Sequence, residues 1–363
     1  MKYIKLWQGF RNIFKDVDID SICKKYDIIN YTINKSGSID VVGNVDLSDK
    51  GISKLPLKFG KVSGIFNCSH NYLTTLEDCP KSVGGDFRCQ YNKLKSLEFC
   101  PQSVGGSFDC NNNKLTTLEF CTKSVGSNFL CSYNYLTSLE GCPQSVGGTF
   151  NCAYNKLTTL DFCSKSVGGS FDCHNNDLIT LEGCPQSVGT FNCSYNKLTS
   201  LEFCPQSVSD SFYCSVNKLT TFEGCPRSVG GDFYCNNNRL IIFEGCPQSV
   251  GGDFNCSYNE LTTFEGCPQS VGKEFNFHNN KLKDLYGFPE FIDSNVYYNY
   301  NPVSEILYLF NTNRLGKIID LLNEYMVIQQ DGKLVILDRL EEVFHILNME
   351  IPEEINLENY EVY

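Results

Sequence analysis

A block of 21 residues recurs along most of this chain, and this repetition constrains the fold more than any other feature of the sequence. The stretch NCSHNYLTTLEDCPKSVGGDFRCQYNKLKSLEFCPQSVGG, from Asn67 to Gly106, contains nearly the same phrase twice. A chain of 363 residues ordinarily divides into roughly two or three globular domains, but a repeat array grows by adding units to one continuous core. The period therefore predicts an elongated solenoid in which each unit packs on its neighbours.

Twenty of the 21 cysteines mark the period, and only Cys23 stands outside it. The first series is Cys68, Cys89, Cys110, Cys131, Cys152, Cys173, Cys193, Cys214, Cys235 and Cys256, and the second is Cys79, Cys100, Cys121, Cys142, Cys163, Cys184, Cys204, Cys225, Cys246 and Cys267. One step is 20 residues, because SVGTF at 187–191 has one glycine fewer than SVGGTF at 145–150. We expect this deletion to lie in a turn and to leave the phase of all other positions intact.

Each unit reads S-V-G-G-x-F-x-C-x-x-N-x-L-T-T-L-E-x-C-P-x. Phe87 and Cys89 alternate with polar neighbours, as in a short strand with one buried face, and Leu94 and Leu97 are expected to return to the core. Gly105-Gly106 is expected to permit the tight bend into the next strand. The asparagine three residues after each cysteine is expected to satisfy backbone groups at the bend. Stacked copies would form a buried ladder of Asn71, Asn92, Asn113, Asn134, Asn155, Asn176, Asn196, Asn217, Asn238, Asn259 and Asn280.

The unit matches the leucine-rich repeat pattern L-x-x-L-x-L-x-x-N-x-L, with Phe and Cys at two strand positions that Leu usually holds. It recurs from Phe66 to Leu285 with degenerate copies on both sides, and we count twelve units. The predicted fold is an α/β-type repeat solenoid, mostly β with irregular return segments: a leucine-rich repeat horseshoe.

Small caps are expected at both ends of the solenoid, which we place at residues 45–306, because an open end would expose core and strand edge. In residues 1–44 we expect a helix around Asp18 to Tyr26 and a hairpin with its turn at Lys35-Ser36-Gly37. In residues 307–363 we expect an α+β cap. Helices are expected over SEILYLF, which begins at Ser304, and over LGKIIDLLNEY and RLEEVFHILNM, with a hairpin across Asp331-Gly332.

The 21-residue unit, the opening phrase NVDLSDKGISKLPLKFGKVSG and the closing phrase GKLVILDRLEEVFHILN resemble the leucine-rich repeat proteins that giant DNA viruses of the mimivirus type encode in families. This resemblance covers nearly the whole chain and implies a repeat protein of unassigned function, with a host protein as partner. The pattern P-x-S-V-x-x-x-F-x-C-x-x-N-x-L-T-x-L resembles, more distantly, the repeats of bacterial effectors delivered into host cells. Some of those effectors add a cysteine ubiquitin ligase after the repeats, but no cysteine follows Cys267 here.

Charge and hydropathy exclude other function classes. The net charge of −12 and the pI near 4.9 argue against nucleic-acid binding, because an acidic surface repels phosphates. The amino terminus, MKYIKLWQGFRNIFKD, interrupts its apolar residues with Lys and Arg and so lacks the pattern of a secretory signal. No segment approaches the roughly 20 apolar residues of a membrane-spanning helix. We therefore expect a cytoplasmic protein that is not secreted.

The cysteines and the charged columns offer little for catalysis. Disulfides between neighbouring units are not expected, because adjacent units place their cysteines about 4.8 Å apart, farther than the roughly 3.8 Å between the Cβ atoms of a disulfide. The cysteine spacings also lack the C-x-x-C pattern of zinc sites. Buried packing is the favoured role, with metal binding and redox chemistry as alternatives. His70, His174 and His278 lie about five repeats apart, so neither an enzyme nor a cofactor is expected. A solvated acidic edge, with cation binding as its alternative, is expected at Glu77, Glu98, Glu119, Glu140, Asp161, Glu182, Glu202, Glu223, Glu244 and Glu265.

The outward strand positions vary from unit to unit, whereas V-G, N-x-L and C-P barely change. On a solenoid these positions form the concave sheet face, which usually binds partners, and Tyr with short polar residues is typical of adaptable binding surfaces. The alternative is unconstrained drift, with Tyr present because it favours strands. The candidate binding residues are Tyr91, Tyr133, Tyr154, Tyr195, Tyr213, Tyr234, Tyr258, Arg88, Asp109 and Asp172.

The sequence thus predicts a monomeric, noncatalytic module that binds another protein on its concave face. Two alternatives remain: a structural or self-associating component, such as part of a virion, and an adaptor that recruits other machinery through its end segments.

Overall fold

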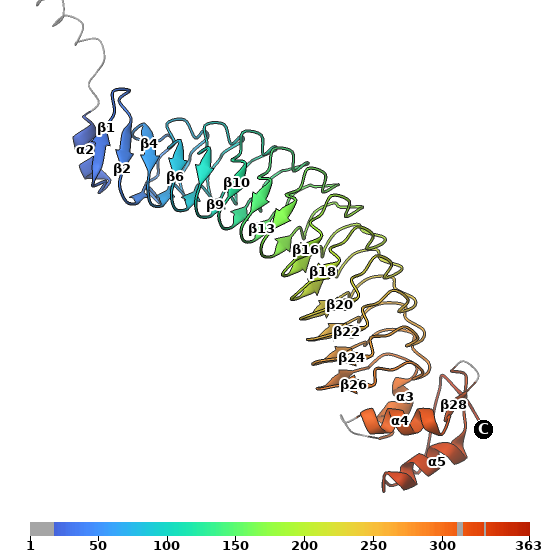
Figure 1. Ribbon diagram of the computed structural model, residues 1–363. Coiled ribbons are helices and arrows are strands. Elements are labelled where there is room, and N and C mark those ends of the chain that lie inside the picture. Colours follow the sequence, from blue (N-terminus) through green and yellow to red (C-terminus); the bar gives the residue numbers. More distant parts are fainter. Residues whose placement is uncertain (1–17, 311–314, 330–331) are drawn as a thin grey trace, which may run out of the picture.

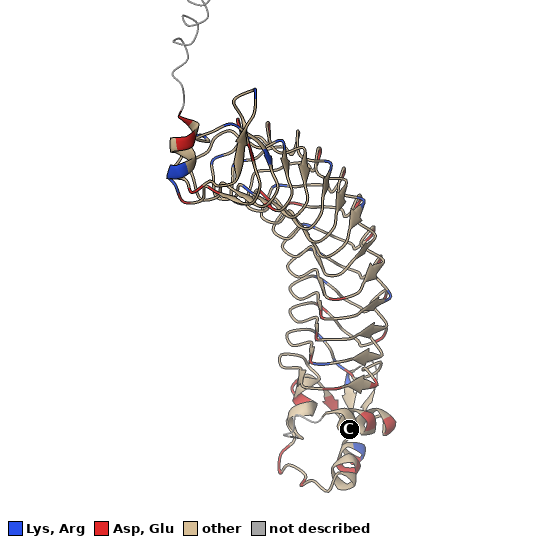
Figure 2. Ribbon diagram, turned by 60° about the vertical axis from the view of Figure 1, so that its left-hand side comes forward, with Lys and Arg blue, Asp and Glu red and all other residues tan. Residues whose placement is uncertain are grey.

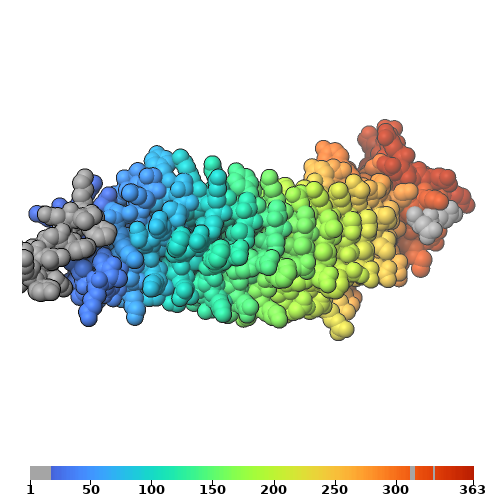
Figure 3. Space-filling model, turned by 90° about the horizontal axis from the view of Figure 1, so that it is seen from above, coloured from blue at the N-terminus to red at the C-terminus, as the bar shows by residue number. Residues whose placement is uncertain are grey.

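The chain forms one curved rod in the computed structural model, which describes residues 18–310, 315–329 and 332–363 (Figure 1). The labelled strands β16 to β26 lie on the inner side of the arc, and irregular return segments form its outer side. In Figure 3 the colours follow one another along the long axis, so the units stack in chain order. Residues 1–17, where we expect no secretory signal, and Asp331 of the expected hairpin turn lie outside the described residues.

One parallel sheet runs through the whole solenoid and is built from the Phe-x dipeptides. Its register places each Phe on the Phe of the next unit, for example Phe87 on Phe108. Thirteen strands bound the twelve turns and confirm the leucine-rich repeat fold. They are β3 (Val45–Asp46), β5 (Phe66–Asn67), β7 (Phe87–Arg88), β9 (Phe108–Asp109), β11 (Phe129–Leu130), β13 (Phe150–Asn151), β15 (Phe171–Asp172), β17 (Phe191–Asn192), β19 (Phe212–Tyr213), β21 (Phe233–Tyr234), β23 (Phe254–Asn255), β25 (Phe275–Asn276) and β27 (Val296–Tyr297).

The Ser-Val dipeptides form further parallel strands, three residues upstream of the Phe-x strands. An eight-stranded sheet contains β1 (Tyr31–Ile33), β2 (Ile39–Val41), β4 (Phe59–Val62), β6 (Ser82–Val83), β8 (Ser103–Val104), β10 (Ser124–Val125), β12 (Ser145–Val146) and β14 (Ser166–Val167). A separate six-stranded sheet contains β16 (Ser187–Val188), β18 (Ser207–Val208), β20 (Ser228–Val229), β22 (Ser249–Val250), β24 (Ser270–Val271) and β26 (Phe291–Ile292).

The break between these two sheets falls at the 20-residue unit. The phase of the Phe-x strands is kept across it, as expected, because Phe171 still pairs with Phe191, but the pairing of the Ser-Val strands is interrupted. In full-length units the first glycine donates its N–H to the Val carbonyl of the preceding unit, as Gly168 does to Val146 at 3.0 Å. Gly189 instead donates its N–H to the carbonyl of Gly169 at 2.9 Å. In full-length units it is the second glycine that makes this hydrogen bond, as Gly169 does to Gly148. The missing residue is therefore the one that joins consecutive Ser-Val strands.

The paired glycines lie in a bend between the two strands, as expected, and the structure adds a second reason for them. Gly105 does not adopt a positive φ, but a Cβ atom on it would lie 2.3 Å from the carbonyl oxygen of Gly84 in the preceding unit. A Cβ on Gly147 would likewise lie 2.2 Å from the carbonyl oxygen of Gly126. Glycine is thus favoured because the backbones of successive units approach closely, and not because the bend needs a left-handed conformation.

Phenylalanine rings form the axis of the core. The rings of Phe66 to Phe275 in the Phe-x strands follow one another with centroids 5.0 to 6.0 Å apart, within the range of favourable aromatic pairs. Leu94 and Leu97 and their equivalents in other units are fully buried beside this column. One unit buries too little apolar surface to stand alone, so neighbours stabilise each other through this shared core.

All 21 cysteines are free thiols, and most are buried. Several donate weakly to a carbonyl of the next unit, as Cys131 Sγ does to Asn151 and Cys142 Sγ to Phe162, at 3.4 and 3.2 Å. Burial raises the pKa of the Cys89 thiol well above its ordinary value, and raises the pKa of Cys142 to about 11. The thiols therefore pack as small, neutral groups.

Both ends of the solenoid carry additional elements. At the amino end, α2 (Ile19–Lys25) begins after Asp18, whose side chain accepts from the Ser21 N–H, and the β1-β2 hairpin joins the solenoid because β2 pairs with β4. At the carboxyl end lie α3 (Ser304–Tyr308), α4 (Gly316–Glu324), β28 (Ile328–Gln329), β29 (Leu334–Val335), α5 (Leu337–Ile346) and β30 (Glu361–Val362). The expected boundary after residue 306 falls inside α3, and the sequence did not predict β30, which pairs with β29. None of the described helices is long and apolar enough to cross a membrane.

Insertion of one glycine between Val188 and Gly189 should join the two Ser-Val sheets. We expect a gain in unfolding free energy of roughly 1 to 2 kcal/mol from the restored hydrogen bonds, measured by urea denaturation. The same insertion after Gly168, in a unit that already has both glycines, is the control and should destabilise the protein. Equal effects of the two insertions would contradict this account of the break.

The native protein should react slowly with a thiol reagent and expose 21 reactive thiols only on denaturation. Because burial raises the thiol pKa values, raising the pH from 7 to 9 should increase native reactivity much less than for a free cysteine. The half-buried Cys121, Cys225, Cys246 and Cys267 should react first. Rapid reaction of the first cysteine series in the native state would contradict the packing role.

Candidate functional site

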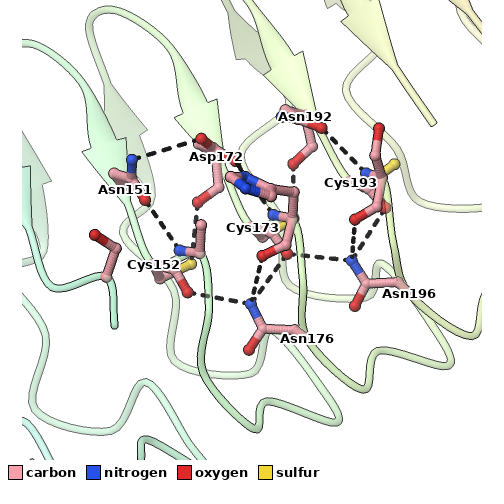
Figure 4. A network of polar contacts seen from close by, with 12 residues as sticks. Asn151, Cys152, Asp172, Cys173, Asn176, Asn192, Cys193 and Asn196 are labelled. Carbon is pink, nitrogen blue, oxygen red and sulfur yellow. Dashed lines mark hydrogen bonds and ion pairs between the residues drawn. The ribbon is translucent and has the colours of Figure 1, made fainter. Parts of the chain in front are cut away.

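An asparagine side chain holds each turn that follows a Phe-x strand. Nδ2 of Asn176 donates to the carbonyls of Cys152 in the preceding unit, of Cys173 and of His174, at 3.1, 3.0 and 3.3 Å (Figure 4). Its Oδ1 accepts the N–H of Leu157 in the preceding unit at 2.9 Å. The amide therefore satisfies backbone groups of two units at a bend where the sheet cannot.

The same contacts recur in every ladder residue. Each of the other ladder asparagines donates from Nδ2 to a carbonyl of its own unit and to one in the unit before. These residues are Asn71, Asn92, Asn113, Asn134, Asn155, Asn196, Asn217, Asn238, Asn259 and Asn280. Asn301 repeats the pattern one unit beyond the expected ladder. The ladder fixes the backbone of the residue that precedes each asparagine.

That preceding residue carries most of the candidate tyrosines, which do not lie in the strands as expected. Tyr91, Tyr133, Tyr154, Tyr195 and Tyr258 have φ angles between +53° and +55°, in the left-handed region, and follow the strand by three residues. The sequence pattern was misread because the strands are only two residues long. The alternation of buried and exposed residues continues into the turn, so the turn looked like part of a longer strand.

The tyrosine rings are exposed, and most of them contact the ring of a tyrosine or histidine in a neighbouring unit. The exposed fractions run from 38% at Tyr154 to 53% at Tyr195, which leaves one ring face or edge of each open to a partner. Tyr133 and Tyr154 lie nearly parallel with centroids 4.1 Å apart, and His174 meets Tyr154 edge-on at 4.8 Å. A hydrogen bond with Tyr154 raises the pKa of the Tyr133 hydroxyl. These contacts hold the rings in one arrangement before any partner binds.

The outward strand positions have a structural role that sequence reasoning missed. Asp109 accepts the N–H of Asn111 at 3.0 Å, and Asp172 accepts the backbone N–H and the Nδ1 of His174 at 3.2 and 2.6 Å. Partial burial raises the pKa of the Asp109 carboxyl. The recurrence of Asp or Asn two residues before the turn was the available signal, because such side chains cap the backbone two residues on. These two carboxylates are therefore engaged within the fold.

The other three candidates occupy the same strand position without such a cap. Arg88 forms an ion pair with Asp86 at 2.8 Å and is partly exposed. Tyr213 and Tyr234 meet edge-on with centroids 5.3 Å apart, and burial together with Asp253 raises the pKa of Tyr234 to about 12. These residues lie beside the turn tyrosines, in the Phe-x sheet.

A groove of about 670 Å³ lies on the Ser-Val strands near the amino end, and residues such as Ser82, Ser103 and Val104 line it. None of the candidate binding residues lines this groove. The Ser-Val strands on the inner side of the arc therefore point their valines into the core and leave serine outside, whereas the tyrosines lie at the edge where the Phe-x strands end.

The titratable groups do not converge. Each of the three histidines of the array contacts a tyrosine in a neighbouring unit, namely Tyr91, Tyr154 and Tyr258, so the three remain far apart along the rod. Desolvation lowers the pKa of His278. Within the described ranges, no group of three or more His, Cys, Asp and Glu residues is arranged to hold a metal ion. Figure 2 shows Lys and Arg scattered among Asp and Glu along the described units, without one basic face.

The fold is that of the leucine-rich repeat proteins, as comparison with solved structures indicates. YopM from Yersinia enterocolitica WA-314 aligns with a TM-score of 0.52 and 18% identity, over 83% of this chain and 73% of that one. A second match, a leucine-rich effector protein YopM from Yersinia pestis, has a TM-score of 0.46 and 19% identity over 71% and 83% of the two chains. The leucine-rich repeat domain of APL1 follows at 0.41 and 14%, over 67% and 74%. No family model matches the sequence, and no curated protein does.

Replacing Asn113 by Ala should lower the free energy of unfolding by roughly 2 kcal/mol or more, because it leaves buried backbone groups of two units without partners. The loss of unfolding free energy is measured by urea denaturation monitored by circular dichroism. Thr116→Ala, at an exposed position in the same unit, is the control and should change stability by less than about 0.5 kcal/mol. Similar losses in the two variants would show that the ladder does not hold the turns.

Proposed function

We propose that this protein is a noncatalytic protein-interaction module whose binding surface is the tyrosine edge, formed by Tyr91, Tyr133, Tyr154, Tyr195 and Tyr258. Arg88, Tyr213 and Tyr234 extend the surface onto the adjoining strands. Asp109 and Asp172 lie at its margin, where they support the turns. The partner is a protein, and the resemblance to giant-virus repeat proteins supports a host-cell protein.

The observation that carries this proposal is the left-handed backbone under exposed tyrosines. A positive φ is unfavourable for a bulky residue, whereas Asn tolerates it well. Other units use Asn112, Asn175, Asn237 and Asn279 at the same position with the same φ. Strand propensity therefore does not favour tyrosine here, which removes the explanation that it is present because Tyr favours strands. Recognition by a partner gives a reason for its retention.

The arrangement suits protein recognition. Tyrosine supplies a large contact area with few rotatable bonds, and its hydroxyl can donate or accept a hydrogen bond. Ring stacking between Tyr133 and Tyr154, together with the rigid turn below, means that little side-chain freedom is lost on binding. We propose that the module acts as a monomer and in the cytoplasm.

The test compares the intact protein with a variant carrying Tyr133→Asn, Tyr154→Asn and Tyr195→Asn in affinity capture from host-cell extract, followed by direct titration of any captured protein. Asparagine is the residue that other units use at this position, so the variant should fold with unchanged or higher stability. We expect at least about a ten-fold loss of affinity, as for a cluster of aromatic hot-spot residues.

The control variant carries Tyr72→Ser and Tyr135→Ser, which change exposed tyrosines on the return segments. It should bind as the intact protein does. If the triple variant retains full affinity, the tyrosine edge is not the binding surface. If light scattering instead detects a defined oligomer that the triple variant loses, the edge serves self-association, and the structural role is correct.

A further inference from the structure

A second column of exposed aromatic residues lies at the opposite edge of the strands, just before each Ser-Val strand begins. Phe99, Phe120, Phe162 and Phe203 are 53 to 67% exposed and have φ angles between +65° and +72°. At the same position six other units have glycine with φ between +80° and +88°. We call these four residues the phenylalanine column.

Phenylalanine is energetically unfavourable at this position. A left-handed conformation disfavours a bulky side chain and suits glycine, and an exposed ring contributes no core packing. Because other units have Gly at this position, the presence of Phe in four units indicates that a binding partner covers these rings. Clustered exposed apolar rings commonly mark interaction sites.

Acidic side chains flank the column. Each Phe follows directly after a carboxylate, Glu98, Glu119, Asp161 or Glu202, and within the described part of the chain none of these four forms an ion pair. In the groove beside Phe99, Lys58 and Lys81 balance Glu77 and Asp78. In the groove beside Phe120, Glu119 and Glu140 outnumber Lys123. An occupant of this surface should therefore combine apolar rings with positive charge.

A row of grooves leads from the start of α2 to the first two rings. Ile19 lines a groove of about 600 Å³ together with Lys58 and Asp78. Lys58 and Asp78 also line the next groove, of about 410 Å³, which contains Phe99. A third groove, of about 450 Å³, contains Phe120 with Glu119 and Glu140. The chain that precedes Ile19 thus starts at the end of a surface that continues to Phe120.

Residues 1–17 have the composition that this surface requires. Lys2, Lys5, Arg11 and Lys15 against Asp16 give this segment a charge of +3, which leaves −15 for the rest of a chain whose net charge is −12. Its apolar residues recur at intervals of three and four, at Leu6, Trp7, Phe10, Ile13 and Phe14. Seventeen residues span about 25 Å as a helix and about 55 Å when extended, and either length covers the roughly 10 Å of two stacked units.

We propose that residues 1–17 bind to the phenylalanine column of their own chain, with their apolar side chains on Phe99 and Phe120 and their Lys and Arg side chains beside Glu98, Glu119 and Glu140. Phe162 and Phe203 continue the column in later units.

Trp7 reports on this contact, because it is the only tryptophan of the chain. The experiment measures its emission maximum and its quenching by acrylamide in the full-length protein and in a free peptide of residues 1–17. The key variant carries Phe99→Gly and Phe120→Gly, which introduces the residue that other units use and should not impair folding. We expect blue-shifted, shielded emission in the intact protein and a shift toward the free peptide in the variant.

The control is Tyr133→Asn with Tyr154→Asn at the opposite edge, which should leave Trp7 shielded. Screening by 1 M salt should weaken the shielding, because the Debye length falls to about 3 Å. The proposal is overturned if Trp7 is as accessible in the intact protein as in the peptide, or equally shielded after the Phe→Gly changes. Shielding that grows with protein concentration would also overturn it, in favour of a second copy as the source of the segment.

Discussion

The asparagine amide that joins each turn to the unit before it is the contact on which the rest of the structure depends. A two-residue strand supplies few hydrogen bonds, and the bend that follows takes further backbone groups out of the sheet. In Asn176 one planar amide satisfies the N–H of Leu157 and the carbonyls of Cys152 and Cys173. Because the preceding unit provides two of these groups, the amide couples the shape of a turn to the stacking of the solenoid.

This coupling explains why both edges of the strand layer can carry exposed aromatic residues. The ladder holds the residue before each asparagine in a left-handed conformation whatever its side chain is, so Tyr91 and Asn112 share one backbone. At the other edge Phe99 and Gly141 do the same. Buried positions therefore remain nearly constant along the repeat, whereas the side chains at two exposed positions can differ from unit to unit without altering the fold.

Much of the core follows from the sequence because it depends on local patterning. The burial of Phe87 and Leu94 follows from their period, and the inward-turned asparagine follows from its fixed offset to the cysteine. Other features depend on contacts between units and were therefore misjudged. The close approach of Gly105 to the carbonyl of Gly84 was not foreseen, and Tyr133 was assigned to a strand that ends before it. The shortened phrase SVGTF keeps the phase of the Phe-x strands, as expected, but its effect on the pairing of the Ser-Val strands was not foreseen.

The sequence by itself determined the repeat, its phase and its buried residues, because a 21-residue period with fixed apolar positions can close a core in only one stacked arrangement. The tertiary structure decided where the strands end, which glycines touch the neighbouring backbone and which exposed side chains share an edge. These properties arise from the distance between successive units and from the backbone angles that the asparagine ladder imposes. Neither quantity is encoded in any single repeat, since both exist only when one unit lies against the next.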